Sequence, residues 1–333
     1  MSAARHTEGM VTADEGPRRR GAVRSPARGL AVLLELTKVR LTLLVVATTA
    51  TGFLVAPTSR PWPVLAWVLL GTLLAACGAM ALNQAIEWRR DLRMERTRHR
   101  PVPAGTISPV RAGALGVGLA LAGVALLTAM VNALTGGLAA LVVVLYAGVY
   151  TPLKAVSPAC TLVGAVCGAI PPLMGWSGAT GSLSFGAWAL AALLFAWQIP
   201  HFLALAWLYR DDYERGGFRM LPLVDPAGVA TGAMATLYAA ALIPVGLAPA
   251  VAGFAGAGYA LAAAGLGLLL LLAAAAMARQ RTSRAARRLF FATLVYLPLL
   301  LGALLTDRPH PRGESRTATA SVLAAPGRAT VDP

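Results

Sequence analysis

The 333-residue sequence contains few charged side chains: only 13% of its residues are Asp, Glu, Lys or Arg, whereas 57% are hydrophobic. A soluble globular domain carries about 25% charged residues. The charges also fall in short clusters, and the apolar stretches between them reach the roughly 20 residues that a membrane-spanning helix needs. The composition therefore excludes a water-soluble globular protein and predicts an all-α, polytopic membrane bundle.

Cysteine is also scarce, and its distribution excludes two kinds of site. Cys77, Cys160 and Cys167 lie within or at the edge of apolar segments and lack the paired spacing of zinc ligands or of a disulfide framework. Basic residues outnumber acidic ones, which gives a net charge of +15. The Arg residues lie in short loops between apolar stretches, as the positive-inside rule requires, so we expect no nucleic-acid partner.

Apolar stretches of spanning length repeat along the chain, and we expect about nine transmembrane helices. They are rich in Gly, Ala and Thr, which favour close packing of helices in lipid. The stretches cover residues 39–56, 62–86, 108–129, 132–150, 160–178, 185–207, 228–250, 254–277 and 288–306. We expect one membrane domain over residues 29–306, between polar tails at 1–28 and 307–333 whose composition is typical of disorder.

Basic residues mark one side of the membrane. They are concentrated in the loops after the second, fourth, sixth and eighth stretches, whereas the opposite loops hold little besides Arg60. This asymmetry predicts that the N-terminus and the basic loops are cytoplasmic and that the C-terminus lies outside. The N-terminal segment has the pattern of neither a cleaved signal peptide nor a Ser-rich transit peptide, so we expect the inner membrane of a bacterial cell.

The acidic residues outside the tails lie on the same side as the basic loops. Seven of the eight, all except Glu35, fall in the loops after the second and sixth stretches. Carboxylates at membrane depth are costly and usually functional. Asn83, Glu87 and Asp91 are four residues apart, so a helix would place them on one face with about 40° of drift per step. This oxygen-rich face suits Mg²⁺ that keeps a phosphate ligand; the alternative is the polar end of an amphipathic helix.

The second acidic segment, 209–215, contains Asp211 and Asp212. Two carboxylate clusters on one side of a bundle could each hold one Mg²⁺ and clamp a bridging diphosphate, while basic side chains bind the remaining oxygens. The predicted catalytic and metal-binding residues are Asn83, Glu87, Asp91 and Asp212. The predicted basic residues are Arg96, Arg98, Arg100 and Lys154. For these four, the alternative is a purely topological charge.

Four segments resemble one family of membrane enzymes. The string NQAIEWRRDLRMERTRHRP at 83–101 is similar to the first Asp-rich motif of the UbiA-type intramembrane prenyltransferases, in the form typical of the protoheme IX farnesyltransferases. Three further segments share the resemblance: ELTK at 35–38, GAIPPLMGW at 168–176, and 197–222, which begins with WQIPHF and ends with MLP. Together they extend over about residues 33–306 in the order of the family.

The resemblance implies nine helices around a central cavity that opens toward lipid. It implies farnesyl diphosphate and heme b as substrates, two Mg²⁺ ions, heme O as product, and partners that use it, such as a heme A synthase or a terminal oxidase assembly. Further expected substrate-binding residues are Lys38, Tyr150, Gln198, His201, Asp211 and Tyr213. For His201, a hydrogen bond across helices is the alternative. Pro171-Pro172 is expected to break the fifth span, or more modestly to kink it and so open the cavity.

The sequence departs from the pattern of this family at four positions. Glu87 stands where Asp is usual, Val39 and Ala155 where Pro and Arg are common, and Cys160 where Asn is frequent. These changes bear on diphosphate affinity and leave the expected architecture unaltered. The alternatives are a related prenyltransferase that acts on a quinone precursor or another tetrapyrrole, a non-catalytic relative, and a membrane transporter. A transporter would more often carry ionisable residues near mid-membrane.

Overall fold

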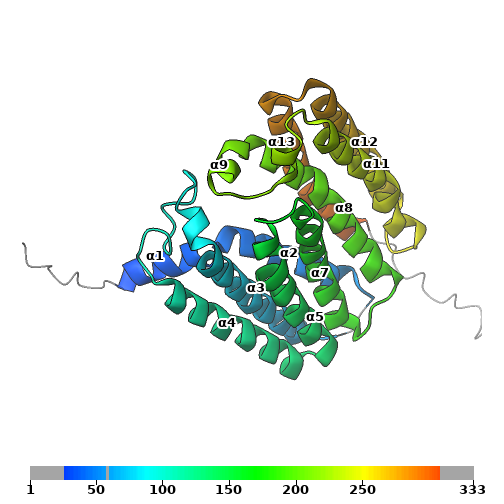
Figure 1. Ribbon diagram of the computed structural model, residues 1–333. Helices are drawn as coiled ribbons and strands as arrows, with labels where there is room; N and C mark the ends of the chain where they lie inside the picture. The colour runs from blue at the N-terminus through cyan, green and yellow to red at the C-terminus, as the bar shows by residue number, and fades with distance from the viewer. Residues whose placement is uncertain (1–25, 58–59, 308–333) are drawn as a thin grey trace, which may run out of the picture.

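The chain forms a helical bundle, which the computed structural model describes over residues 26–57 and 60–307 (Figure 1). All regular secondary structure in these ranges is helical. The elements are α1 (Pro26–Leu36), α2 (Val39–Val55), α3 (Trp62–Asp91), α4 (Pro109–Met130), α5 (Ala133–Val143), the π-helix η1 (Val144–Tyr150), α6 (Thr151–Leu153), α7 (Cys160–Thr180), α8 (Phe185–Leu208), α9 (Arg210–Arg215), α10 (Leu221–Val224), α11 (Val229–Val251), α12 (Ala257–Gln280) and α13 (Ser283–Thr306).

The two predicted tails lie almost entirely outside the described residues. The first tail was expected to extend to residue 28, but α1 begins at Pro26. Its sequence is amphipathic, with Leu30, Leu33 and Leu34 exposed on one short helix. Such a helix is suited to lie in the plane of a membrane interface, which explains why it could be missed by a search for spanning stretches.

Eight helical segments within the described residues are long and apolar enough to cross a membrane. They contain 21 to 30 residues each, and one of them, Ala133–Leu153, combines α5, η1 and α6. They coincide with eight of the nine predicted stretches, and the ninth, 39–56, forms the shorter apolar helix α2 of 17 residues. The prediction of an all-α polytopic membrane bundle is confirmed.

The inner and outer helices differ in burial. In Figure 1, α1, α3 and α4 lie at one edge of the bundle and α11, α12 and α13 at another, with α2, α7 and α8 between them. The apolar spans of α7 and α8 are 78% and 67% buried, whereas that of α4 is 22% buried. Outer positions such as Leu121 and Leu261 expose their side chains, as expected where a helix surface faces lipid.

Glycine allows neighbouring helices to approach closely, both at the edge of the bundle and at its centre. A Cβ atom at Gly78 of α3 would lie 2.5 Å from the backbone nitrogen of Ala120 in α4. A Cβ atom at Gly175 of α7 would overlap the carbonyl oxygen of Thr49 in α2. Helices in lipid associate through this kind of close backbone packing, because the hydrophobic effect does not drive them together there.

The expected break at Pro171-Pro172 is wrong. α7 continues from Cys160 to Thr180 with both prolines inside it. Proline lacks an amide hydrogen and therefore removes a hydrogen bond from the preceding turn. Both prolines are buried, and Gly52 of α2 packs against the Pro172 backbone. Neighbouring helices can maintain a proline-containing turn in this way, which local sequence rules do not anticipate.

Candidate active site

Three polar side chains share one face at the end of α3. Asn83, Glu87 and Asp91 are each at most 5% exposed, and all three lie in the continuous helix Trp62–Asp91. Their predicted placement on one helix is therefore correct. Buried carboxylates are stable only when charges or hydrogen bonds compensate them, so their partners define the site.

Each of these three side chains contacts a basic residue, two of them from distant parts of the chain and one, Arg100, from the loop that follows α3. The contacts join Lys38 Nζ to Asn83 Oδ1 at 2.9 Å, Lys154 Nζ to Glu87 Oε1 at 2.5 Å, and Arg100 Nη1 to Asp91 Oδ2 at 2.8 Å. Three cations thus face two carboxylates and one neutral amide. The excess of basic over acidic side chains makes this cluster suited to a polyanion, whose negative charge would favour the protonated form of Lys38.

The turn between α1 and α2 brings Lys38 to the cluster. Its backbone adopts the left-handed conformation, with φ at 48°, which is unfavourable for a residue with a side chain. Gln84 of α3 fixes the preceding segment by donating to the carbonyl oxygens of Glu35 and Leu36 at 3.0 and 2.9 Å. Burial, together with the nearby positive charge of Arg100, lowers the pKa of Lys38 to about 7.

Asn83 links the carboxylate face to the π-helix η1. Its Nδ2 donates to Glu87 Oε2 at 2.8 Å and to Thr151 Oγ1 at 3.2 Å. Thr151 Oγ1 in turn donates to the carbonyl oxygen of Tyr146 at 2.7 Å. π-Helical turns are rare and are often found at functional sites. Sequence reasoning missed Thr151, because neither its type nor its position before Pro152 distinguishes it.

Asp212 of α9 is surrounded by different partners. Its carboxylate accepts hydrogen bonds from the backbone amides of Glu95 and Arg96, at 3.0 and 3.3 Å, and from Arg215. Desolvation raises the pKa of Asp212, but the hydrogen bonds from Arg215 and these two amides outweigh it and lower the pKa below its usual range. Asp212 thus contacts the loop after α3, and the expectation that both acidic segments hold Mg²⁺ stays a prediction. Arg215 was not predicted, although its i+3 spacing from Asp212 could have indicated it.

Magnesium fits the donor set when a substrate supplies further oxygens. Asp91 Oδ1 is buried and has no hydrogen-bond partner. In the described ranges, no group of three or more His, Cys, Asp or Glu residues is arranged to hold a metal ion alone. Mg²⁺ is usually bound by one or two carboxylates together with substrate phosphates. Asp91, with Glu87 and Asn83 beside it, matches this pattern.

Three of the predicted site residues point away from the cluster. The guanidinium group of Arg96 lies 5.0 Å from the centre of the Tyr209 ring. Arg98 forms an exposed ion pair with Glu95 at 2.5 Å. The Asp211 side chain is 79% exposed and lies 3.5 Å from Arg210. Arg100 and Lys154 are therefore the two predicted loop cations that the structure places at the carboxylates.

Aromatic rings surround Lys154. Its Nζ lies 4.9 Å from the centre of the Tyr150 ring and 5.4 Å from that of Phe218. The Tyr213 ring packs edge-on against Phe218, with 5.9 Å between centroids. The carbonyl oxygen of Lys154 accepts from the Arg219 amide at 2.7 Å. The predicted residue Tyr150 thus adjoins the cation that contacts Glu87, and Tyr213 packs against Phe218, the other ring beside this cation.

Gln198 and His201 lie on α8 and contact other helices. Gln198 Nε2 donates to the carbonyl oxygen of Leu194 at 3.1 Å and covers Gly168 of α7. His201 Nδ1 lies 2.8 Å from Thr293 Oγ1 of α13, and its ring stacks on Phe290. The contacts of His201 match the alternative of a hydrogen bond across helices. A substrate-binding role for either residue stays a prediction.

An apolar bundle with a buried, net-positive cluster at one end defines an intramembrane protein equipped to hold a polyanion attached to an apolar group. The comparison with protein families makes this specific. The UbiA prenyltransferase family matches residues 44–295, and the chain belongs to this family.

Individual relatives agree with this assignment. A protoheme IX farnesyltransferase from Solibacter usitatus is 41% identical over 286 residues, which cover 83% of this chain and 98% of the relative. A digeranylgeranylglyceryl phosphate synthase structure has a TM-score of 0.72 at 15% identity and covers 84% of this chain and 98% of its own. A UbiA homologue from Archaeoglobus fulgidus, bound to DMAPP and Mg²⁺, has a TM-score of 0.58 at 12% identity over 82% of this chain and 99% of its own.

Proposed function

We propose that this protein transfers the farnesyl group of farnesyl diphosphate to a vinyl group of heme b and thereby forms heme O. The observation that carries the proposal is the buried face of Asn83, Glu87 and Asp91 opposed by three cations. The name of the Solibacter relative supports the choice of heme as acceptor. The Archaeoglobus homologue supports a prenyl diphosphate with Mg²⁺ as the donor complex.

In the proposed reaction, the cluster makes diphosphate a better leaving group. Lys38, Arg100 and Lys154 turn from their present partners to the diphosphate oxygens, and Asp91 and Glu87 hold Mg²⁺. A second ion is proposed at Asp212. Bound Mg²⁺ supplies charge neutralisation of the diphosphate. The allylic C–O bond then breaks, and its electron pair leaves with the diphosphate.

The apolar helices then protect the allylic cation. Water would quench this cation, so its charge must develop in a dry pocket. The electron pair of the heme vinyl group forms the new C–C bond, and the positive charge moves to the adjoining carbon. Water adds there and loses a proton, which leaves a hydroxyl group. No residue of the chain forms a covalent bond to a substrate in these reaction steps.

The orientation and location belong to the same proposal. The site lies at the end of α3 that carries Arg89 and Arg90, and the positive-inside rule supports a cytoplasmic position for this end in a bacterial cell. The N-terminus is then cytoplasmic and the C-terminus outside the inner membrane. To test this, Arg60→Cys and Arg284→Cys are made separately in a variant that has Ala at the three native cysteine positions. Each is treated with an impermeant maleimide in intact cells. Labelling at Arg60 alone supports the proposal, and labelling at Arg284 alone contradicts it.

Product analysis tests the reaction itself. The purified protein in lipid nanodiscs is incubated with heme b, farnesyl diphosphate and Mg²⁺, and the extract is separated by reverse-phase chromatography with mass detection. A product that has gained the mass of farnesyl plus water is expected. If heme b stays unchanged and a quinone precursor is prenylated instead, heme b is not the acceptor, but the proposal of a prenyl diphosphate donor still holds. Co-purification of heme O with a heme A synthase or terminal oxidase would identify the proposed partner.

A further inference from the structure

A small groove opens between the end of α8 and the first turns of α13. It has a volume of about 300 Å³ and is lined by Leu208, Tyr209, Arg287, Phe290 and Phe291. Tyr209 and Phe291 are 39% and 57% exposed, so the groove opens at the surface of the bundle. Three of its five lining residues are aromatic. The lining therefore offers flat surfaces to a flat ligand.

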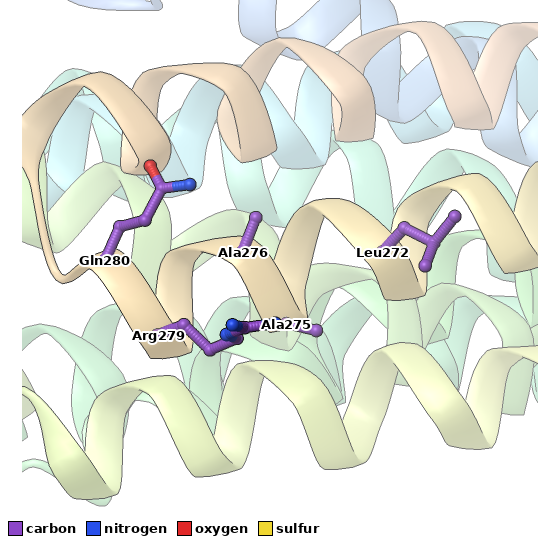
Figure 2. A pocket seen from close by; sticks show the side chains of 5 residues that line it. All are labelled: Leu272, Ala275, Ala276, Arg279 and Gln280. Atoms are coloured by element: carbon purple, nitrogen blue, oxygen red, sulfur yellow. The ribbon is translucent and has the colours of Figure 1, made fainter.

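The aromatic lining distinguishes this groove from a larger one. A groove of about 400 Å³ on α12 is lined by Leu272, Ala275, Ala276, Arg279 and Gln280 (Figure 2). Figure 2 shows Arg279 and Gln280 pointing to different sides of α12, with only aliphatic side chains between them and Leu272. Such a surface suits a flexible acyl chain. The α8–α13 groove is the smaller of the two but has the rings that a conjugated ligand would stack on.

The α8–α13 groove adjoins the candidate active site through Tyr209. The guanidinium group of Arg96 lies over the Tyr209 ring at 5.0 Å. The backbone amide of Arg96 donates to Asp212. One wall of the groove is formed by Tyr209, the first residue of the second acidic segment. A ligand that stacks on Tyr209 would lie next to the loop that contacts Asp212.

A layer of packed side chains supports the other wall. Phe290 stacks on His201, with 5.0 Å between ring centroids, and His201 stacks on Trp197 at 5.1 Å. Trp197 Nε1 donates to the carbonyl oxygen of Thr293 at 2.9 Å, and His201 Nδ1 lies 2.8 Å from the hydroxyl of Thr293. The stack thus ties α8 to α13 below the groove. It holds Phe290 in place before any ligand arrives, which favours binding.

Arg287 is the charged residue of this groove. It is exposed and forms no ion pair with any residue in the part of the chain that the structure describes. Neither α8 nor α13 contains Asp or Glu. An arginine beside aromatic rings and without an acidic partner is suited to a carboxylate on an aromatic ligand.

We infer that the groove between α8 and α13 binds the carboxylate-bearing edge of the acceptor, with the conjugated macrocycle on Tyr209, Phe290 and Phe291 and one carboxylate on Arg287. The inference rests on the proposed function for the identity of the acceptor as a tetrapyrrole. The volume of about 300 Å³ is at the lower limit of the roughly 300–1,000 Å³ of pockets for drug-sized molecules, so the proposal assigns only one edge of the macrocycle to this groove. The remainder extends along Tyr209 toward Arg96 and Asp212, where the second ion of the donor complex is proposed.

Binding without catalysis tests this inference. The protein in nanodiscs is titrated with heme b, and separately with its dimethyl ester, in the absence of farnesyl diphosphate, and tryptophan quenching reports binding. Arg287→Gln is expected to weaken heme b binding about tenfold, as loss of a charge-assisted contact does. The ester should bind wild type as weakly as heme b binds this variant. Phe291→Leu should weaken both ligands, because the ring contacts the macrocycle.

Arg288→Gln is the matched control. It removes the same charge one residue further along α13, about 100° around the helix, where the side chain does not line the groove. Its affinity for heme b should equal that of wild type. An equal loss of affinity in both Arg variants would overturn the inference and indicate a general effect of surface charge. Unchanged affinity in Arg287→Gln would overturn it as well, because Arg287 would then not contact the ligand.

The product assay separates this inference from the proposed function. Formation of heme O by wild type, together with an unaltered Kd and KM for heme b in Arg287→Gln, would overturn the proposal that the groove binds heme b and would support the proposed function. Heme b binding that depends on Arg287, without any heme O from wild type, would support the groove and contradict the function.

Discussion

The two acidic segments meet at one end of the bundle, but they are stabilised differently. Asp91 is 1% exposed and contacts Arg100, while one of its oxygens has no hydrogen-bond partner. Asp212 accepts from two backbone amides and from Arg215, which is three residues away. The α3 segment thus has a carboxylate oxygen that is free to bind a ligand, whereas both carboxylate oxygens of Asp212 in α9 accept hydrogen bonds, two of them from the loop after α3. In this comparison α3 keeps an unpaired carboxylate oxygen for a ligand, whereas Asp212, besides holding the proposed second ion, positions the loop after α3.

The largest effect is expected for Asp91→Ala. The substitution removes the oxygen proposed to hold Mg²⁺, so heme O formation should fall by at least about 100-fold. It also leaves Arg100 without its partner, which should destabilise the protein by about 1–3 kcal/mol. Product analysis and thermal unfolding in detergent measure the two effects. Addition of Arg100→Gln should restore stability without restoring activity, and recovery of activity would contradict a role for Asp91 in binding the ion.

Asp212→Ala should also abolish turnover, with the protein still folded in the membrane. The informative variant is Asp212→Asn, which retains one oxygen for the amide of Glu95, loses the second oxygen that accepts from Arg96 and lacks the charge that a second Mg²⁺ needs. Turnover as low as in Asp212→Ala would support the metal role. Near-normal turnover in Asp212→Asn would assign Asp212 to positioning alone and would reduce the proposal to one ion.

Lys154→Gln should produce a smaller effect, mainly on the donor. Lys154 contacts Glu87 at 2.5 Å and is proposed to turn to the diphosphate. Its loss should raise the KM for farnesyl diphosphate about tenfold, as expected for one charged contact. The KM for heme b should stay the same, because Lys154 lies outside the α8–α13 groove. Equal increases for both substrates would indicate a disturbed fold instead.

Glu87→Asp is expected to be tolerated. The shorter side chain would withdraw from Lys154 and free it for the diphosphate, so the affinity for farnesyl diphosphate should rise by a few-fold or remain unchanged. Titration with a non-hydrolysable diphosphate analogue measures this directly. A complete loss of activity would show that the reach of Glu87, and not only its charge, is required.

The sequence alone was sufficient for the membrane class, the helix positions and the face of Asn83, Glu87 and Asp91, because these depend on local periodicity. The partners of Asn83 could not be predicted. Lys38 contacts it because the turn before α2 is left-handed, and Thr151 contacts it from the position that directly follows the π-helix η1. Both depend on tertiary packing that overrides local preference. Nothing in the sequence distinguished the four predicted basic residues of the loops from one another. Of these four, Arg100 and Lys154 contact the α3 carboxylates in the described chain, and Arg96 and Arg98 do not.

The smallest effect is expected for Asp211→Asn, one residue from Asp212. The sequence marked both as site residues, but Asp211 is 79% exposed and lies 3.5 Å from Arg210. Exposed ion pairs contribute about 0–1 kcal/mol, so activity and stability should stay close to wild type. The same assay on Asp211→Asn and Asp212→Asn compares neighbouring carboxylates that differ in burial. A loss of tenfold or more in Asp211→Asn would mean that α9 rotates when substrates bind, so that the structural contrast between these two residues does not hold in the working enzyme.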